Sequence, residues 1–297
     1  LLKIYDRVCS VLEGKVLIKM HTGEPHGPNI IPRPWVKSLL EQRLPGASLG
    51  ETNAYYESVR KTTAGHRIVL RTNGWTEFTE VDLLDEEGGE MFPVRGGKWF
   101  DEISLGSHIK NYDSLLTLTH FKGHIAGGFG GSNKNLGIGC ADGVVGKAMI
   151  HTGENEQPFT KVKEEFMERM CESAKGVVDH FEGKAAFINV MRNMSVSCDC
   201  EGVNAAPVVT PNVGILASLD ICAVDNACVD CIYAMTDEQN HDLTERMESR
   251  HGLRQLSYMY ELGMGNQLYT LIDIDNEEKE ITAKDAVKHC VAFKLEV

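Results

Sequence analysis

Histidines, a lysine and closely spaced glycines gather in one stretch of the chain, residues 115–151. His120 and His124 lie four residues apart, Lys134 follows ten residues later, and His151 ends the stretch. Nine glycines fall between positions 123 and 146, and glycine lets a backbone reach positive φ or approach another group closely. Imidazoles can share a metal or exchange protons near neutral pH, and an amine can hold an anion or form an imine. The stretch therefore predicts a site shaped around a bound object.

Each of these residues also has an ordinary structural explanation. One of the two spaced histidines can cap a strand end while the other bonds to a carbonyl, and Lys134 can be a surface lysine. We predict catalytic roles for His120, His124 and Lys134, because all three lie in the same glycine-rich segment. A loop of this kind can also hold an anion through backbone N–H groups. The predicted cofactor-binding residues are Gly130, Gly131, Lys134 and Asn135.

The glycine run does not match the common nucleotide-binding loops. A Walker loop needs a hydroxyl directly after its lysine, and neither GGSNKN nor VVGKAM supplies one. The string GGFGG does not follow the first strand of a unit and open a helix, as a dinucleotide-binding loop does. The sequence therefore gives no support for nucleotide binding by these routes.

Five cysteines within 34 residues form a second group. We expect Cys198 and Cys200 on one side of a strand, about 6.6 Å apart at roughly 3.3 Å per residue, a distance that two thiolates on one soft metal can close. Cys222, Cys228 and Cys231 follow on an expected helix. They are either ligands of zinc or an iron–sulfur cluster or small packing residues, and we favour packing for Cys222 and Cys231.

One further histidine follows an expected strand. His21 comes directly after residues 15–20 and opens a loop rich in proline. In open α/β sheets, ligands bind at the carboxyl ends of the strands, so this position suits a ligand side chain. The predicted metal ligands are His21, His120, His151, Cys198 and Cys200.

Short apolar runs alternate with amphipathic segments along the whole chain. Strands are expected at residues 15–20, 47–52, 77–84, 115–119, 185–190, 214–218 and 269–274. Helices are expected at 1–12, 35–43, 57–73, 161–181 and 219–233, with Asp220 as the cap of the last one. Such alternation predicts a three-layer α/β architecture, with mixed or mainly parallel sheet flanked by helices. We expect one domain over residues 1–297, or two α/β lobes at about 1–113 and 114–297.

The composition excludes two classes of partner. The chain of 297 residues has 43 acidic and 30 basic residues and a net charge of −13, so as a whole it repels nucleic acid and anionic membranes. No apolar run reaches the roughly 18 residues of a spanning helix, and the first residues do not resemble a signal peptide. The nine cysteines are expected to stay reduced. We therefore expect a cytoplasmic protein that binds a small anionic molecule or a metal.

Several strings in the same order resemble the domain of unknown function 362 family, whose members are often labelled iron–sulfur centre proteins. They are KMHTGEP at 19–25, THFKGHIAGGFGGSNKNLGIG at 119–139, HTG at 151–153, SCDC at 197–200 and GILASLDICAVDNAC at 214–228. The resemblance covers nearly the whole chain. It implies an α/β fold and leaves the reaction open.

The segment from His124 to His151 is also similar, more distantly, to the catalytic segment of the nickel-pincer lactate racemases. A histidine, a lysine and a second histidine occur there in the same order and at nearly the same spacing. The resemblance implies that His124 is an acid/base, that Lys134 links a cofactor or binds an anion, and that His151 is a metal ligand. This likeness covers about thirty residues.

Two functions from different classes follow. The first is a metal-dependent isomerase or oxidoreductase that acts on a small anionic metabolite at a site of histidines and Lys134, with nickel, zinc or iron as the divalent metal. The alternative is an iron–sulfur or other metal-cluster protein that uses Cys198 and Cys200 to exchange electrons with a redox partner protein.

Overall fold

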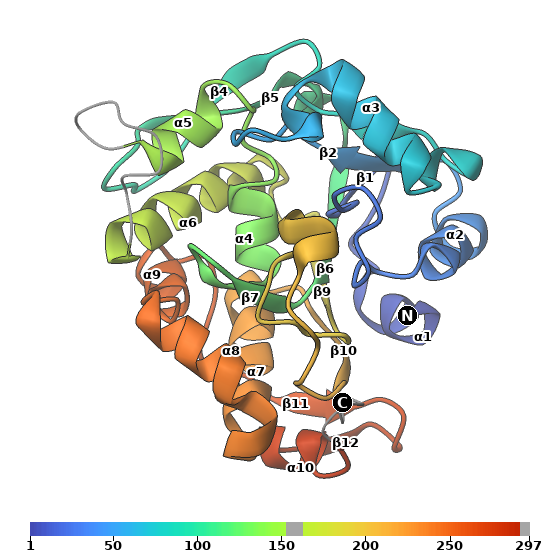
Figure 1. Ribbon diagram of the computed structural model, residues 1–297, viewed down its shortest axis with the longest axis vertical. Coiled ribbons are helices and arrows are strands. Elements are labelled where there is room, and N and C mark those ends of the chain that lie inside the picture. Colours follow the sequence, from blue (N-terminus) through green and yellow to red (C-terminus); the bar gives the residue numbers. More distant parts are fainter. Residues whose placement is uncertain (153–162, 292–297) are drawn as a thin grey trace.

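One central sheet of six strands organises the protein. The computed structural model describes residues 1–152 and 163–291, and its main sheet has the order β10-β9-β6-β1-β2-β3 (Figure 1). Neighbouring strands are parallel, except that β10 runs antiparallel to β9. The strands span Val16–Lys19 (β1), Ser48–Glu51 (β2), Val81–Leu83 (β3), Ser114–His120 (β6), Ala185–Met191 (β9) and Gly214–Ser218 (β10). The predicted α/β fold with a mainly parallel sheet is confirmed.

Helices cover both faces of this sheet and give the three predicted layers. Consecutive side chains of a strand point to opposite faces, and Leu17 and Ile18 of β1 accordingly enter two different hydrophobic clusters. The Ile18 cluster packs against Leu2–Val8 (α1), Arg33–Gln42 (α2) and Thr63–Thr72 (α3). The Leu17 cluster packs against Ser132–Gly137 (α4), Gly146–His151 (α5), Lys163–His180 (α6), Ile221–Tyr233 (α7), Asp237–Ser249 (α8), Arg254–Glu261 (α9) and Ala283–Val287 (α10).

The strand order reverses near the middle of the sheet. From β1 the chain moves outward to β2 and β3, and it then returns to the other side of β1 to form β6, β9 and β10. Ligands of open α/β sheets bind where the strand order reverses in this way, beyond the carboxyl ends of the strands. Here the reversal lies between β1 and β6. The segments before and after residue 113 both contribute strands to this sheet, and a division into two lobes stays a prediction.

In residues 1–152 and 163–291, three hairpins lie outside the main sheet. They pair Gly89–Pro93 (β4) with Glu102–Gly106 (β5), Lys122–His124 (β7) with Gly128–Gly130 (β8), and Leu271–Asp273 (β11) with Lys279–Ile281 (β12). The strand expected at 269–274 is therefore shorter and belongs to a separate hairpin. The hairpin β7–β8 carries His124 and leads directly into α4, so it places part of the glycine-rich stretch (Figure 1).

Some expected boundaries differ from the structure. The helix expected at 57–73 is interrupted, because the hydroxyls of Ser58 and Thr62 each accept a backbone N–H and begin separate helical segments, Val59–Lys61 and α3. The strand expected at 77–84 is reduced to β3. The expected helix at 161–181 corresponds to α6, and its first two residues, like residue 153 of the HTG string, lie outside the described residues. In the described part of the chain, every helix is too short or too polar to cross a membrane.

Candidate functional site

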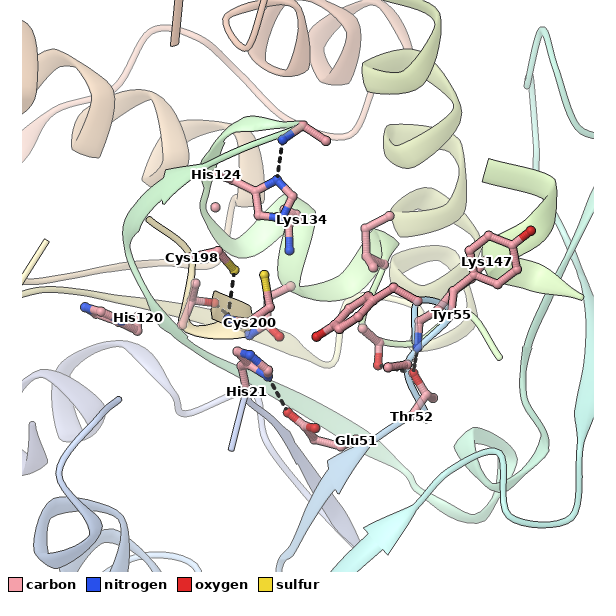
Figure 2. Close-up of a pocket in the computed structure, with 18 of the residues that line it drawn as sticks. His21, Glu51, Thr52, Tyr55, His120, His124, Lys134, Lys147, Cys198 and Cys200 are labelled. Carbon is pink, nitrogen blue, oxygen red and sulfur yellow. Dashed lines mark hydrogen bonds and ion pairs between the residues drawn. The ribbon is translucent and has the colours of Figure 1, made fainter. Parts of the chain in front are cut away.

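A cavity of about 340 Å³ opens at the carboxyl ends of β1, β2 and β6, where the strand order reverses (Figure 2). Its size suits a small metabolite. All ten predicted site residues line it: His21, His120, His124, Gly130, Gly131, Lys134, Asn135, His151, Cys198 and Cys200. The fold thus brings together residues from segments that lie far apart in the sequence, although the role of each one depends on its own contacts.

The glycine-rich loop is anchored by a carboxylate from a neighbouring helix, α7. Asp225 of α7 accepts hydrogen bonds from the backbone N–H groups of Ser132 (2.7 Å) and Asn133 (2.9 Å) at the start of α4. A Cβ at Gly131 would overlap this carboxylate, so only glycine fits there. Asn135 of α4 then donates to Thr119 Oγ1 (2.9 Å). These bonds fix α4, and with it Lys134, against the sheet.

Two thiols and an imidazole form a compact group in the cavity. The candidate ligand atoms of His124, Cys198 and Cys200 all lie within 4.8 Å of one another. Cys198 was expected on a strand. In the structure it instead caps a 3-10 helix, Asp199–Asn204. Its sulfur accepts the backbone N–H of Cys200 (3.4 Å), and this turn, rather than the alternation of a strand, brings the two thiols together. Sulfur and imidazole ligands suit zinc, iron and other soft metals.

The two thiols are electrostatically different. A hydrogen bond from Cys200 holds the pKa of the Cys198 thiol well below its ordinary value, and the nearby charge of Lys134 adds to this effect. The same hydrogen bond raises the pKa of Cys200 well above its ordinary value. Of the two thiols, Cys198 therefore loses its proton more readily, and the thiolate is the form in which cysteine binds metals.

His21 is oriented by a buried carboxylate. Its Nδ1 lies 2.9 Å from Glu51 Oε1 at the end of β2. Glu51 also accepts bonds from Arg60 (3.1 Å) and from the ring of His66 (3.0 Å). Burial disfavours ionisation of Glu51, but its cationic and hydrogen-bonding partners, His21 first among them, hold its pKa well below the ordinary value. His21 Nε2 is buried and has no hydrogen-bond partner in the described part of the chain.

His120 is committed to protein partners at both ring nitrogens. Its Nδ1 contacts the carboxylate of Asp199 (2.9 Å), and its Nε2 donates to the carbonyl of Arg192 (2.7 Å). Lys122 also pairs with Asp199, at 3.1 Å. His120 thus helps to hold Asp199, which lies between the two cysteines in the sequence, and in this structure both of its ring nitrogens are occupied by protein partners. The catalytic and metal-binding roles predicted for His120 stay predictions, and each would require the ring to give up one of these contacts.

His151 ends α5 on another wall of the cavity. Its Nδ1 donates to the carbonyl of Lys147 (2.8 Å), and its ring lies near those of Tyr55 and Phe166, at centroid distances of 5.7 and 5.1 Å. Burial lowers the pKa of His151 to about 4, so the ring is neutral at physiological pH. The close group of metal-binding atoms found among the described residues does not include His151, so its predicted role as a ligand stays a prediction.

Cations outnumber acids on the wall of the cavity. The charged side chains that line it, apart from the histidines and cysteines, are Lys19, Glu51, Arg60, Lys122, Lys134 and Lys147. Lys147 is held by Thr52 Oγ1 (2.7 Å), and burial lowers its pKa to about 8. The Lys134 ammonium, in contrast, has no hydrogen-bond or ion-pair partner among the residues that the structure describes. An anion is the partner that such an ammonium lacks.

Several residues of the site were not predicted. Lys19 and Glu51 stand at the last positions of β1 and β2, and Asp199 lies between the two cysteines. The rule that ligands bind at the carboxyl ends of strands could have found the first two. No local signal marks Arg60 or Lys147, which reach the cavity from a 3-10 helix and from α5.

The remaining cysteines of the second group belong to the core. Cys222, Cys228 and Cys231 are fully buried in α7 and do not line the cavity, so the packing predicted for Cys222 and Cys231 is confirmed. The predicted cap is also confirmed, because the Asp220 side chain accepts the N–H of Ala223 (2.9 Å). The described residues therefore offer two thiols to the cavity and not the four that common iron–sulfur clusters require.

Residues 16–230 match the family described as "Domain of unknown function (DUF362)". No curated protein matches the chain. Among solved structures, the lactate racemase apoprotein from Thermoanaerobacterium thermosaccharolyticum is similar at 14% identity with a TM-score of 0.39, over 66% of this chain and 46% of the racemase chain. The match thus spans less than half the length of the racemase.

Proposed function

Because the chain belongs to the DUF362 family, which leaves the reaction open, its function rests on the site itself, and we propose a metal-dependent enzyme that acts on a small anionic metabolite. One observation carries the proposal. Two thiols and an imidazole within 4.8 Å of one another lie in a cavity whose other charged residues are mostly cationic. The thiols are suited to bind a metal, and the cationic side chains are suited to bind an anion.

The donor set indicates the kind of metal. Thiolates and imidazoles favour zinc, iron or nickel over magnesium and calcium, which prefer oxygen ligands. Cys198 and Cys200 supply two ligands, and one imidazole of the cavity completes a set of three. Three protein ligands leave a further position for water or substrate, as in catalytic zinc sites. A metal bound there would supply Lewis-acid or redox chemistry next to the anion.

Lys134 is the group that we propose to bind the anion. It lies on α4, and its charge acts on both Cys198 and His124, so an anion on its ammonium would be close to the metal-binding thiols. Lys122 and Lys147 already have protein acceptors. A carboxylate is the simplest anion for a cavity of this size, and isomerase or oxidoreductase chemistry at its α-carbon fits the surrounding imidazoles.

Metal analysis tests the proposal. We expect the purified protein to bind one Co²⁺ or Zn²⁺ per chain, with a sulfur-to-cobalt charge-transfer band in the near ultraviolet for the cobalt form. The double variant Cys198→Ser/Cys200→Ser is expected to lose both the metal and the band. The variant Cys290→Ser is the matched control, because Cys290 lies outside the cavity. A wild-type protein that binds no metal, or a double variant that binds it equally well, refutes the proposal. Iron with acid-labile sulfide and a broad band near 400 nm supports the electron-transfer alternative instead.

A further inference from the structure

The histidines of the cavity differ in which ring nitrogen carries the proton. His124 Nδ1 accepts hydrogen bonds from the backbone N–H groups of Ala126 (3.2 Å) and Gly127 (2.9 Å). A backbone N–H can only donate, so Nδ1 must present its lone pair, and the neutral ring then carries its proton on Nε2. A ring nitrogen of His124 lies within 4.8 Å of the Cys198 sulfur. Since Nε2–H is the only donor of the neutral ring, it is the group that can donate to this sulfur.

This proton position makes His124 a poor metal ligand. A ligating nitrogen gives its lone pair to the metal, while the other nitrogen usually donates its N–H to a carbonyl or a carboxylate. To bind a metal through Nε2, His124 would have to move its proton to Nδ1, where it would face two backbone N–H donors. The two hydrogen bonds to Nδ1 and the contact of Nε2–H with Cys198 would be lost, and two backbone donors would be left without an acceptor. Closeness to the thiols is therefore not sufficient to make His124 a ligand.

His21 has the opposite arrangement. Its Nδ1 faces the carboxylate of Glu51, which can only accept, so Nδ1 carries a proton, and in the neutral form of the ring, the form that binds metals, Nε2 presents the lone pair. That Nε2 is buried and has no partner among the described residues. A histidine whose N–H is bound by a carboxylate is a common form of metal ligand. Glu51 is held in turn by Arg60 and by the N–H of Thr22 (2.7 Å), which fixes the direction of the ring.

From these contacts we infer that His21 is the imidazole ligand of the proposed metal, together with Cys198 and Cys200, and that His124 is a positioning residue that donates Nε2–H to the Cys198 thiolate. The inference rests on the proposed metal site. In Figure 2 the His21 ring lies between Glu51 and Cys200. His21 is not part of the 4.8 Å group, so side chains of the cavity must shift when the metal binds.

Cobalt titration of single variants separates the two histidines. We expect His21→Ala to weaken Co²⁺ affinity at least tenfold, whereas His124→Ala changes it less than threefold. His124→Ala should still shift the energy of the sulfur-to-cobalt band, because the Cys198 thiolate loses a hydrogen bond. His26→Asn is the matched control, since His26 lies in the same loop, is exposed and has a positive φ that asparagine adopts readily. Circular dichroism confirms that each variant is folded.

The outcomes separate this inference from the proposed function. If the wild-type protein shows no thiolate–cobalt band, the proposed metal site itself is refuted. If the band is present, a larger loss in His124→Ala than in His21→Ala, an equal loss, or no loss in either variant overturns the assignment of His21. A measurement on the metal-free wild-type protein does not depend on any variant: ¹⁵N NMR should show His124 protonated at Nε2 and His21 at Nδ1, and the reverse pattern overturns the inference.

Discussion

Replacement of His151 by glutamine should make the protein less sensitive to acid. Burial of the ring lowers the pKa of His151 to about 4, from 6.5 in an unfolded chain. The folded state therefore favours the neutral ring, and the stability that this provides is fully present above pH 6.5 and is lost as the pH falls toward 4. The shift of about 2.5 units corresponds to roughly 3.4 kcal/mol at about 1.36 kcal/mol per unit. About 2 kcal/mol of this should be lost by pH 5.

Urea unfolding of the metal-free protein at pH 7.5 and pH 5 measures this effect. We expect the free energy of unfolding to fall by about 2 kcal/mol more in the wild-type protein than in His151→Gln, which cannot titrate there. The variant His241→Gln is the control, because the His241 side chain is 67% exposed on α8 and loses no buried site on protonation. The reasoning is refuted if wild type and His151→Gln lose stability in parallel between the two pH values.

Three other substitutions test separate parts of the site. Gly131→Ala should lower the free energy of unfolding by about 1–3 kcal/mol, as measured by urea unfolding, because the new Cβ meets the carboxylate of Asp225. Lys134→Gln should weaken the binding of acetate or inorganic phosphate, followed by calorimetry, by about 10- to 100-fold, whereas Lys37→Gln on the exposed side of α2 should not. Arg60→Met should cost about 3–5 kcal/mol of stability, because two buried carboxylates lose their shared counterion; a loss below about 1 kcal/mol would show that the network is not needed.

The sequence predicts several strands of the main sheet better than the connections. β6, β9 and β10 begin and end within one residue of the expected positions, because short segments rich in apolar residues define their bounds. The segment Cys198–Asn204 was missed because its turn depends on a thiol that accepts a backbone N–H, a cap that carries no strong sequence signal. For the same reason the distance between the two thiols could not be derived from spacing alone.

The sequence indicates which residues line the candidate site, but it does not indicate the role of each histidine within it. The sequence predicts His120, His124 and His21 as site residues by position, and all three reach the cavity. Their roles differ because of partners that come from other segments: Asp199 for His120, the backbone after His124, and Glu51 for His21. Such partners are set by the tertiary fold, and residue spacing contains no information about which nitrogen of a ring carries a proton.

The charge distribution adds a constraint on how the ligand is bound. The whole chain carries a net charge of −13, so its long-range field opposes the approach of an anion. Within the cavity the balance is reversed, and Lys134 lacks an acceptor among the residues that the structure describes. Attraction therefore acts at short range, inside a site shielded from much of the solvent, where added salt screens charges less than it does on the surface. Affinity for a small carboxylate should then depend strongly on Lys134 and weakly on ionic strength, whereas a strong salt dependence would place the anion on the exposed surface.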